Sequence, residues 1–344
     1  MAKTRLGFDI GSNSMKVAVL QGDSVRVEDV RLPENLVDES GNITLPHAFS
    51  QFLKQKKKEL SLPHGTASLV LPPQQAICRL VTMPKMTTDQ LLMNLPYEFA
   101  DFVQGMADQY YCDYALCTPT GEEIERNGAQ IGENGGQEDG ENSGEQVVTM
   151  MAAVAAKQTL ADYVQMFARA GIKLRTILPQ EMTLIELVKG RSGAKEFCFV
   201  DLGHQATRIT VVCQDRVQAT RQINVGGRNL DLAVADQLGV DPFLANTYKS
   251  GNYQGIQAET ALTDLCDRIA VEILKVINFY QFTYRNSSLE GIYLIGGGAA
   301  MPYLRDSIEE TVGLSLLSPE DLMPGAGKRS ADGVFAAGAA MGGK

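Results

Sequence analysis

One pattern occurs twice in this chain, and it constrains the fold more than any other feature. Residues 6–21 read as a strand, an Asp-x-Gly turn and a second strand, and residues 197–214 repeat that order. Short runs rich in β-branched residues on either side of a polar turn predict a hairpin in each block. A third strand is predicted after each hairpin, over 24–31 and 217–223. Such a repeat predicts two similar lobes, with a boundary near 188–195, where a Gly-Arg-Ser-Gly run is typical of a linker.

The two turns contain residue types that suit a phosphate group. They consist of Gly11, Ser12, Asn13 and Ser14 in the first block and Gly203, His204, Gln205, Ala206 and Thr207 in the second. A tight hairpin points backbone N–H groups into one concavity, glycine allows close approach, and Lys16 adds positive charge. Asp9 and Asp201 stand at the ends of the strands that enter the turns. Hydrated Mg²⁺ takes one or two carboxylates, so these two predict a water-mediated Mg²⁺ site. A single such hairpin is often only a turn, whereas two at matched positions favour phosphate binding.

A third glycine-rich element follows a buried strand predicted over 291–295. It consists of Gly296, Gly297, Gly298 and Ala299, and a helix is predicted after it over 303–312. Backbone without side chains can lie against a purine or a ribose, so we interpret this turn as an adenosine contact. The alternative interpretation is a tight strand-to-helix turn without a ligand.

Composition excludes several classes of protein. Hydrophobic residues make up 44% of the chain, enough for a substantial core. No window approaches the ~18 apolar residues that predict a membrane span, and the N-terminus lacks the apolar region of a signal peptide. A cytosolic location is therefore expected. The six cysteines form no CxxC pair, which favours buried thiols over a zinc site. No basic stripe that would bind nucleic acid is visible.

The net charge of −10 is concentrated in one segment. Residues 120–146 contain eight acidic residues and one arginine, a net charge of −7, which leaves about −3 for the rest of the chain. This segment has no aromatic residue and cannot bury enough surface to offset the entropy of ordering. We predict a disordered acidic loop inserted between two strands of one sheet, over 110–117 and 147–154.

The three glycine-containing elements, in this order, resemble the actin/Hsp70/sugar-kinase superfamily. The two hairpins resemble its phosphate-1 and phosphate-2 motifs, and the glycine turn resembles its adenosine motif. Residues 331–340 resemble the small-residue connect-2 helix, and residues 180–184 stand in the place of connect-1. The resemblance implies an α/β, two-lobed actin/Hsp70-like (ribonuclease H-like) fold with ATP and Mg²⁺ in its cleft. It also implies adenosine-binding roles for Gly226, Gly227, Glu272 and Lys275, the last two flanking the adenine.

Within that superfamily, almost the whole chain is similar to the PilM family of type IV pilus assembly proteins. The similarity lies in residues 96–99, the strand with Asp113 and Tyr114, the stretch 147–171 and the helix 273–280. His204 and the acidic segment depart from the family pattern: a small residue is usual at the first, and typical members lack the second.

The PilM resemblance also implies how the chain is divided. The first lobe would span 1–190 and include an FtsA-type 1C subdomain over about 75–170, and the second would span 191–344. In the family, the 1C subdomain forms a groove for the short cytosolic N-terminal peptide of the membrane protein PilN.

The function implied is that of a cytoplasmic ATP-binding protein of type IV pilus or related pseudopilus assembly. It would bind a PilN-like tail, work with other pilus assembly components, and reach the inner face of the cytoplasmic membrane only through its partner; homo-oligomer formation stays open. ATP hydrolysis would be slow or absent, because no base that orients water is identifiable. The catalytic residues are therefore unassigned, with Gln180 and Glu181 as candidates.

Two alternative functions are kept. An FtsA-like division or cytoskeletal scaffold would need an amphipathic C-terminal helix, and the short, glycine-rich end of the chain does not supply one. A sugar- or acetate-kinase-type phosphotransferase would need a catalytic Asp in the cleft and a larger first lobe.

Overall fold

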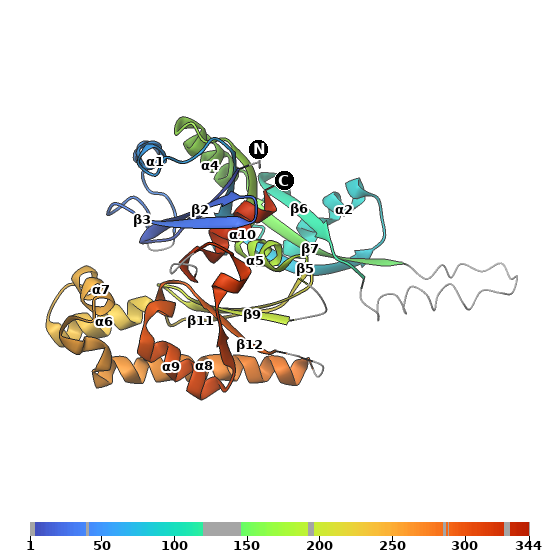
Figure 1. Ribbon diagram of the computed structural model, residues 1–344. Coiled ribbons are helices and arrows are strands. Elements are labelled where there is room, and N and C mark those ends of the chain that lie inside the picture. Colours follow the sequence, from blue (N-terminus) through green and yellow to red (C-terminus); the bar gives the residue numbers. More distant parts are fainter. Residues whose placement is uncertain are drawn as a thin grey trace, which may run out of the picture.

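The computed structural model describes residues 4–38, 41–119, 146–191, 196–284, 287, 289–326 and 331–343. The predicted acidic loop over 120–146 lies outside these residues, apart from Gln146, and so do residues 192–195 of the predicted boundary. In the described part of the chain, the strands form two five-stranded sheets and one three-stranded sheet (Figure 1).

The first large sheet contains the N-terminal hairpin. In spatial order its strands are β3 (Ser24–Arg31), β2 (Ser14–Gln21), β1 (Arg5–Ile10), β4 (Thr66–Leu71) and β8 (Leu174–Pro179). The first three strands of the chain pair antiparallel, whereas β4 pairs parallel with both β1 and β8.

The second large sheet has the same topology. In spatial order its strands are β11 (Arg216–Ile223), β10 (Thr207–Cys213), β9 (Glu196–Leu202), β12 (Gly291–Ile295) and β13 (Ser315–Leu317). Antiparallel pairs again join its first three strands, and β12 again runs parallel to both of its neighbours. The repeat seen in two short sequence blocks is therefore a repeat of a whole sheet, as predicted.

Helices cover the outer faces of both large sheets and fill the space between them (Figure 1). The first sheet is covered by α1 (Pro46–Glu59) and α4 (Lys157–Arg169), and the second by α8 (Thr260–Thr283) and α9 (Pro302–Val312). Between the sheets lie α5 (Gln180–Val188) and α10 (Val334–Gly342). At one side of the second sheet lie α6 (Gly227–Leu238) and α7 (Pro242–Ser250). Short 3₁₀ turns follow α7, β12 and β13, namely η3 (Tyr253–Ala258), η4 (Gly297–Ala300) and η5 (Pro319–Leu322).

The central helix α10 approaches its neighbours very closely. A Cβ atom on Gly7 of β1 would lie 1.9 Å from the carbonyl oxygen of Ala336, and one on Gly338 would lie 2.1 Å from that of Thr183 in α5. Only glycine fits at these two positions. A helix is predicted over 331–340, and α10 occupies most of that range. It packs on the first sheet, whereas the prediction places it in a second lobe of 191–344.

A three-stranded antiparallel sheet projects from the first lobe. Its strands, in spatial order, are β5 (Ala76–Pro84), β7 (Val147–Ala156) and β6 (Tyr110–Leu116). Against it lie α2 (Thr88–Asn94) and the 3₁₀ turns η1 (Leu95–Phe99) and η2 (Ala107–Gln109). The Thr87 hydroxyl caps α2 by accepting a hydrogen bond from the Gln90 N–H at 3.3 Å, and a 3₁₀ turn that contains Pro96 follows the helix directly.

The small sheet is shorter than the 1C subdomain predicted over 75–170. The last part of that range, α4, packs in the first lobe. The Phe167 ring lies edge-on to the Phe8 ring, with centroids 5.1 Å apart, and its centroid is 6.4 Å from that of Phe49. The buried face of α4 belongs to the core of the first large sheet. The small sheet ends before it, with β7 at Ala156.

Candidate functional site

The first hairpin turn carries a partly buried carboxylate opposite a lysine. Asp9 of β1 and Lys16 of β2 are directly paired in the antiparallel register, and the Gly11 N–H donates to the Ser14 carbonyl at 3.0 Å to close the turn. Burial raises the pKa of Asp9, and the charge of Lys16 lowers it in part. The turn therefore holds an acidic group whose ionised form would be stabilised by a cation.

The second hairpin turn is held by the start of α6. The Gly227 N–H donates to the Gly203 carbonyl at 2.9 Å, and the Arg228 N–H donates to the His204 carbonyl at 2.8 Å. A Cβ on Gly226 would lie 2.7 Å from three backbone atoms of this turn, so the two segments touch without room for a side chain. Gly226 and Gly227 thus pack directly against the second hairpin turn and hold it in place.

Asp201, at the end of β9, is the centre of a polar network on the cleft floor. Gln180 Nε2 donates to Asp201 Oδ2 at 3.4 Å, and Arg208 Nη1 donates to Gln180 Oε1 at 3.0 Å. Burial raises the pKa of Asp201 to about 6; Arg208 and Lys16 oppose this rise, whereas the charge of Asp9 adds to it. Asp9 and Asp201 both line the same cavity, so each lobe contributes one carboxylate to it.

The glycine turn after β12 lies against the same strand end. Gly296 has a φ of +81°, and a Cβ placed on it would lie 2.5 Å from Asp201 Oδ1. A Cβ on Gly298 would lie 2.7 Å from the Leu202 side chain, whereas one on Gly297 would meet nothing within 4 Å. The first and third glycines are therefore required by close contacts, and the middle one is not.

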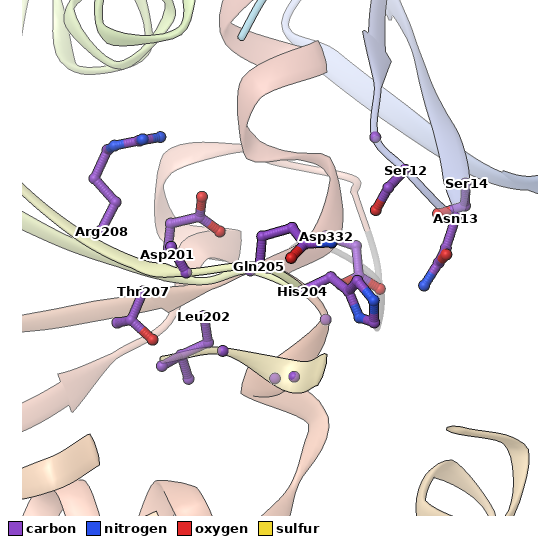
Figure 2. Close-up of a pocket in the computed structure, with 18 of the residues that line it drawn as sticks. Ser12, Asn13, Ser14, Asp201, Leu202, His204, Gln205, Thr207, Arg208 and Asp332 are labelled. Carbon is purple, nitrogen blue, oxygen red and sulfur yellow. The ribbon is translucent and has the colours of Figure 1, made fainter. Parts of the chain in front are cut away.

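These elements enclose a cleft of about 430 Å³ between the two large sheets. Figure 2 shows Ser12, Asn13 and Ser14 on one side and Asp201, His204 and Gln205 on the other. The predicted residues that line it are Asp9, Gly11, Ser12, Asn13, Ser14, Lys16, Asp201, Gly203, His204, Gln205, Ala206, Thr207, Gly226, Gly227, Gly296, Gly297 and Gly298. A volume of this size is within the usual range for a small-molecule site.

Three predicted residues do not line the cleft. Glu272 and Lys275 form an ion pair of 2.6 Å with each other on α8, and Ala299 is buried in the core of the second lobe. On α8, the residues that face the sheet include Ile269, Ile273 and Ile277, and only the first of these reaches the cleft. Glu272 and Lys275 are therefore not among the residues that line the cleft, and their role as adenine contacts stays a prediction.

The comparisons with known proteins agree with this architecture. The sequence model for type IV pilus assembly protein PilM matches residues 137–323, just over half of the chain. The chain belongs to the PilM family. A comparison with curated protein sequences found no match.

Solved structures extend the likeness to the whole PilM-family chain. The PilM–PilN type IV pilus biogenesis complex has a TM-score of 0.77 at 20% identity, with 98% of each chain covered. The ethanolamine utilization protein EutJ from Carboxydothermus hydrogenoformans has 0.56 at 14%, covering 98% of this chain and 89% of its own. MreB 5 of Spiroplasma citri bound to AMPPNP has 0.51 at 10%, covering 98% and 94%. The α/β two-lobed actin-like fold is thereby confirmed.

Three features of this PilM-family site were not visible in the sequence. Lys249 of α7 lies 2.6 Å from Asp231 of α6, and both side chains are almost fully buried. Asn246 also donates to the Asp231 carboxylate, and Asn246 and Lys249 line the cleft. Pro72 and its neighbours, together with Asp332, line other parts of the wall. Sequence spacing gives no signal for a pair of residues on two different helices.

The two candidates on α5 are separated by the structure. Gln180 lines the cleft and contacts Asp201, whereas Glu181 does not line it. Burial raises the pKa of Glu181, and its Oε2 atom has no hydrogen-bond partner among the described residues. Gln180 is therefore the α5 side chain placed to act on a ligand in the cleft.

The donor set fits hydrated Mg²⁺. Within the described residues, no cluster of three or more His, Cys, Asp or Glu side chains could enclose a metal ion. Asp9 and Asp201 instead supply two partly buried carboxylates to one cavity, and Mg²⁺ commonly binds through one or two carboxylates while keeping its waters. Such an ion would neutralise phosphate charge between the two turns.

Proposed function

We propose that this chain is a cytoplasmic ATP-binding protein of type IV pilus, or related pseudopilus, assembly. The observation that carries the nucleotide part is the cleft itself, with a partly buried carboxylate and a glycine-containing turn contributed by each lobe. The buried Gln205 Nε2 atom, which has no hydrogen-bond partner among the described residues, adds a donor at this cleft. The two turns would hold the phosphates, Asp9 and Asp201 the hydrated Mg²⁺, and the glycine turn after β12 the adenosine.

We further propose that ATP is hydrolysed slowly at most. Gln180 is the α5 side chain at the cleft, and it already binds Asp201 and Arg208. A fast ATPase needs a group that positions the attacking water. A side chain engaged on both sides is poorly placed for that role, so binding, rather than turnover, would be the working state.

The proposed partner is the cytosolic tail of a PilN-like membrane protein, and the proposed docking surface is on the small sheet. A groove of about 370 Å³ there is lined by Met93, Pro96, Tyr111 and Lys157, among others. Met93 is 72% exposed and Tyr97 76% exposed, although both are large and apolar. Exposed apolar side chains gathered beside a groove are typical of a peptide-binding surface. In the described residues no helix is both long and apolar enough to span a membrane.

Met93→Glu is expected to weaken binding of the PilN-like tail at least tenfold, because a charge would enter the apolar groove. Fluorescence anisotropy with a labelled synthetic peptide of a PilN-like cytosolic tail measures the effect. Phe282→Glu is the matched control, since Phe282 is 81% exposed on α8 and does not line the groove. Equal loss in both variants, or no binding by the wild type, would contradict the proposed partner site.

A further inference from the structure

His204 connects the second hairpin turn to a buried ionic cluster. Its Nδ1 atom lies 3.6 Å from Asp231 Oδ2, and its side chain is 28% exposed in the cleft. Asp231 is held in place by Lys249, whose Nζ atom lies 2.6 Å from Oδ1, and by the Asn246 amide at 3.1 and 3.2 Å. A rigid carboxylate therefore faces one nitrogen of the imidazole ring.

The geometry fixes which part of the ring faces away from that carboxylate. Since Nδ1 is directed at Asp231, the Nε2 edge points to the opposite side, and Figure 2 shows the His204 ring on the side of its turn that faces Asn13. A neutral imidazole that donates its Nδ1–H to Asp231 carries a lone pair on Nε2. A phosphate oxygen would be repelled by that lone pair, whereas an imidazolium would donate to the carboxylate and the phosphate together.

The charges around His204 permit its imidazole to take up a proton when a phosphate binds. Asp231 and Arg228 belong to α6 beneath the turn, Lys249 belongs to α7, and Lys16 and Asp332 line the same cleft. Asp231 favours the imidazolium, and Lys249 partly cancels that effect because it is bound to the same carboxylate. A bound polyphosphate would bring several negative charges to the ring and favour the protonated form.

We propose that His204 contacts the polyphosphate of a bound nucleotide as an imidazolium held by Asp231, so that nucleotide binding takes up a proton. This inference rests on the proposed binding of ATP in the cleft. It makes His204 a phosphate contact that strengthens as the pH falls from about 8 to about 6, around the ordinary pKa of histidine. Linkage requires that ATP and the proton each increase the affinity for the other by the same factor.

The test is a histidine NMR titration of the full chain, which contains only three histidines. With ¹³C-labelled imidazoles, the pKa of His204 is expected to rise by at least one unit when MgATP is added, equivalent to a tenfold gain in affinity. His47 and His64 lie at the start of α1 and after it, outside the cleft, and serve as internal controls whose titration should not change. His204→Gln assigns the signal, and the change in proton uptake that it causes is measured by calorimetry in two buffers of different ionisation enthalpy.

The outcomes separate the two proposals. MgATP binding with a raised His204 pKa, and with proton uptake reduced in His204→Gln, would support the inference. MgATP binding with an unchanged His204 pKa, or with the same proton uptake in His204→Gln, would overturn the inference and leave the proposed nucleotide site standing. No MgATP binding by the wild type would overturn the proposed nucleotide site, and the inference with it.

Discussion

Asp201→Asn is expected to stabilise the ligand-free protein by about 2–3 kcal/mol at pH 7–8 and to abolish binding of MgATP. Burial raises the pKa of Asp201 from an ordinary value of 3.8 to about 6. At about 1.4 kcal/mol per unit, keeping this carboxylate ionised in the folded state costs about 3 kcal/mol. The isosteric amide removes that cost, and it also removes a carboxylate that would hold the hydrated Mg²⁺.

The pH dependence of this effect has a definite sign. Because the folded-state pKa is above the unfolded-state pKa, the folded protein binds the proton more tightly. The contribution of Asp201 to the free energy of unfolding of the wild type is present at low pH. It is lost as the pH rises from about 4 through about 6. The advantage of Asp201→Asn should therefore be full above pH 7 and vanish near pH 4.

Chemical denaturation at pH 4, 6 and 8 measures the effect, and calorimetry with MgATP measures the loss of binding. Asp236→Asn, at an exposed position on α6, is the control and should change stability by less than about 0.5 kcal/mol. An Asp201→Asn variant that is less stable than the wild type at pH 8 would contradict the cost of keeping Asp201 ionised. One that still binds MgATP fully would contradict its role in holding Mg²⁺.

Gly338→Ala is expected to destabilise the fold by about 2–3 kcal/mol, although alanine favours an α-helix over glycine by about 1 kcal/mol. The new Cβ would lie 2.1 Å from the Thr183 carbonyl oxygen, and that atom belongs to the backbone of α5. Neither helix can move freely, because α10 also packs on β1 and β2. The contact between the two central helices must therefore open.

Thermal unfolding checks this prediction against Gly297→Ala, where the added Cβ meets nothing within 4 Å. The Gly338 variant should melt several degrees lower, and the Gly297 variant should melt within a degree or two of the wild type. If Gly338→Ala raised the melting temperature, as helix propensity alone predicts, the close packing of α5 and α10 would be wrong.

The sequence predicts those parts of the site that are local in the chain. Each Asp-x-Gly turn joins two neighbouring strands, so a few consecutive residues determine both the hairpin and the position of its carboxylate. The glycine turn after β12 is local in the same way. The matching of two such blocks also predicts the repeated sheet, since each block brings the same three antiparallel strands.

The parts that the sequence does not predict depend on packing between distant elements. Glu272 and Lys275 lie outside the cleft lining because the rotation of α8 is set by its contact with the second sheet and with α9. The Asp231–Lys249 pair joins α6 and α7, and no local pattern indicates it. The range predicted for the 1C subdomain includes α4, because the periodicity of a helix shows that one face is buried but not which core receives it.

The most direct test of the nucleotide site is a calorimetric titration of MgATP into the wild type, Gly296→Ala and Asp236→Asn. We expect one saturable site in the wild type, at least tenfold weaker binding in Gly296→Ala, and nearly unchanged binding in Asp236→Asn. The reason is that a Cβ on Gly296 would lie 2.5 Å from Asp201 Oδ1, whereas Asp236 is exposed on α6 and does not line the cleft. No binding by the wild type, or equal binding by all three proteins, would contradict it.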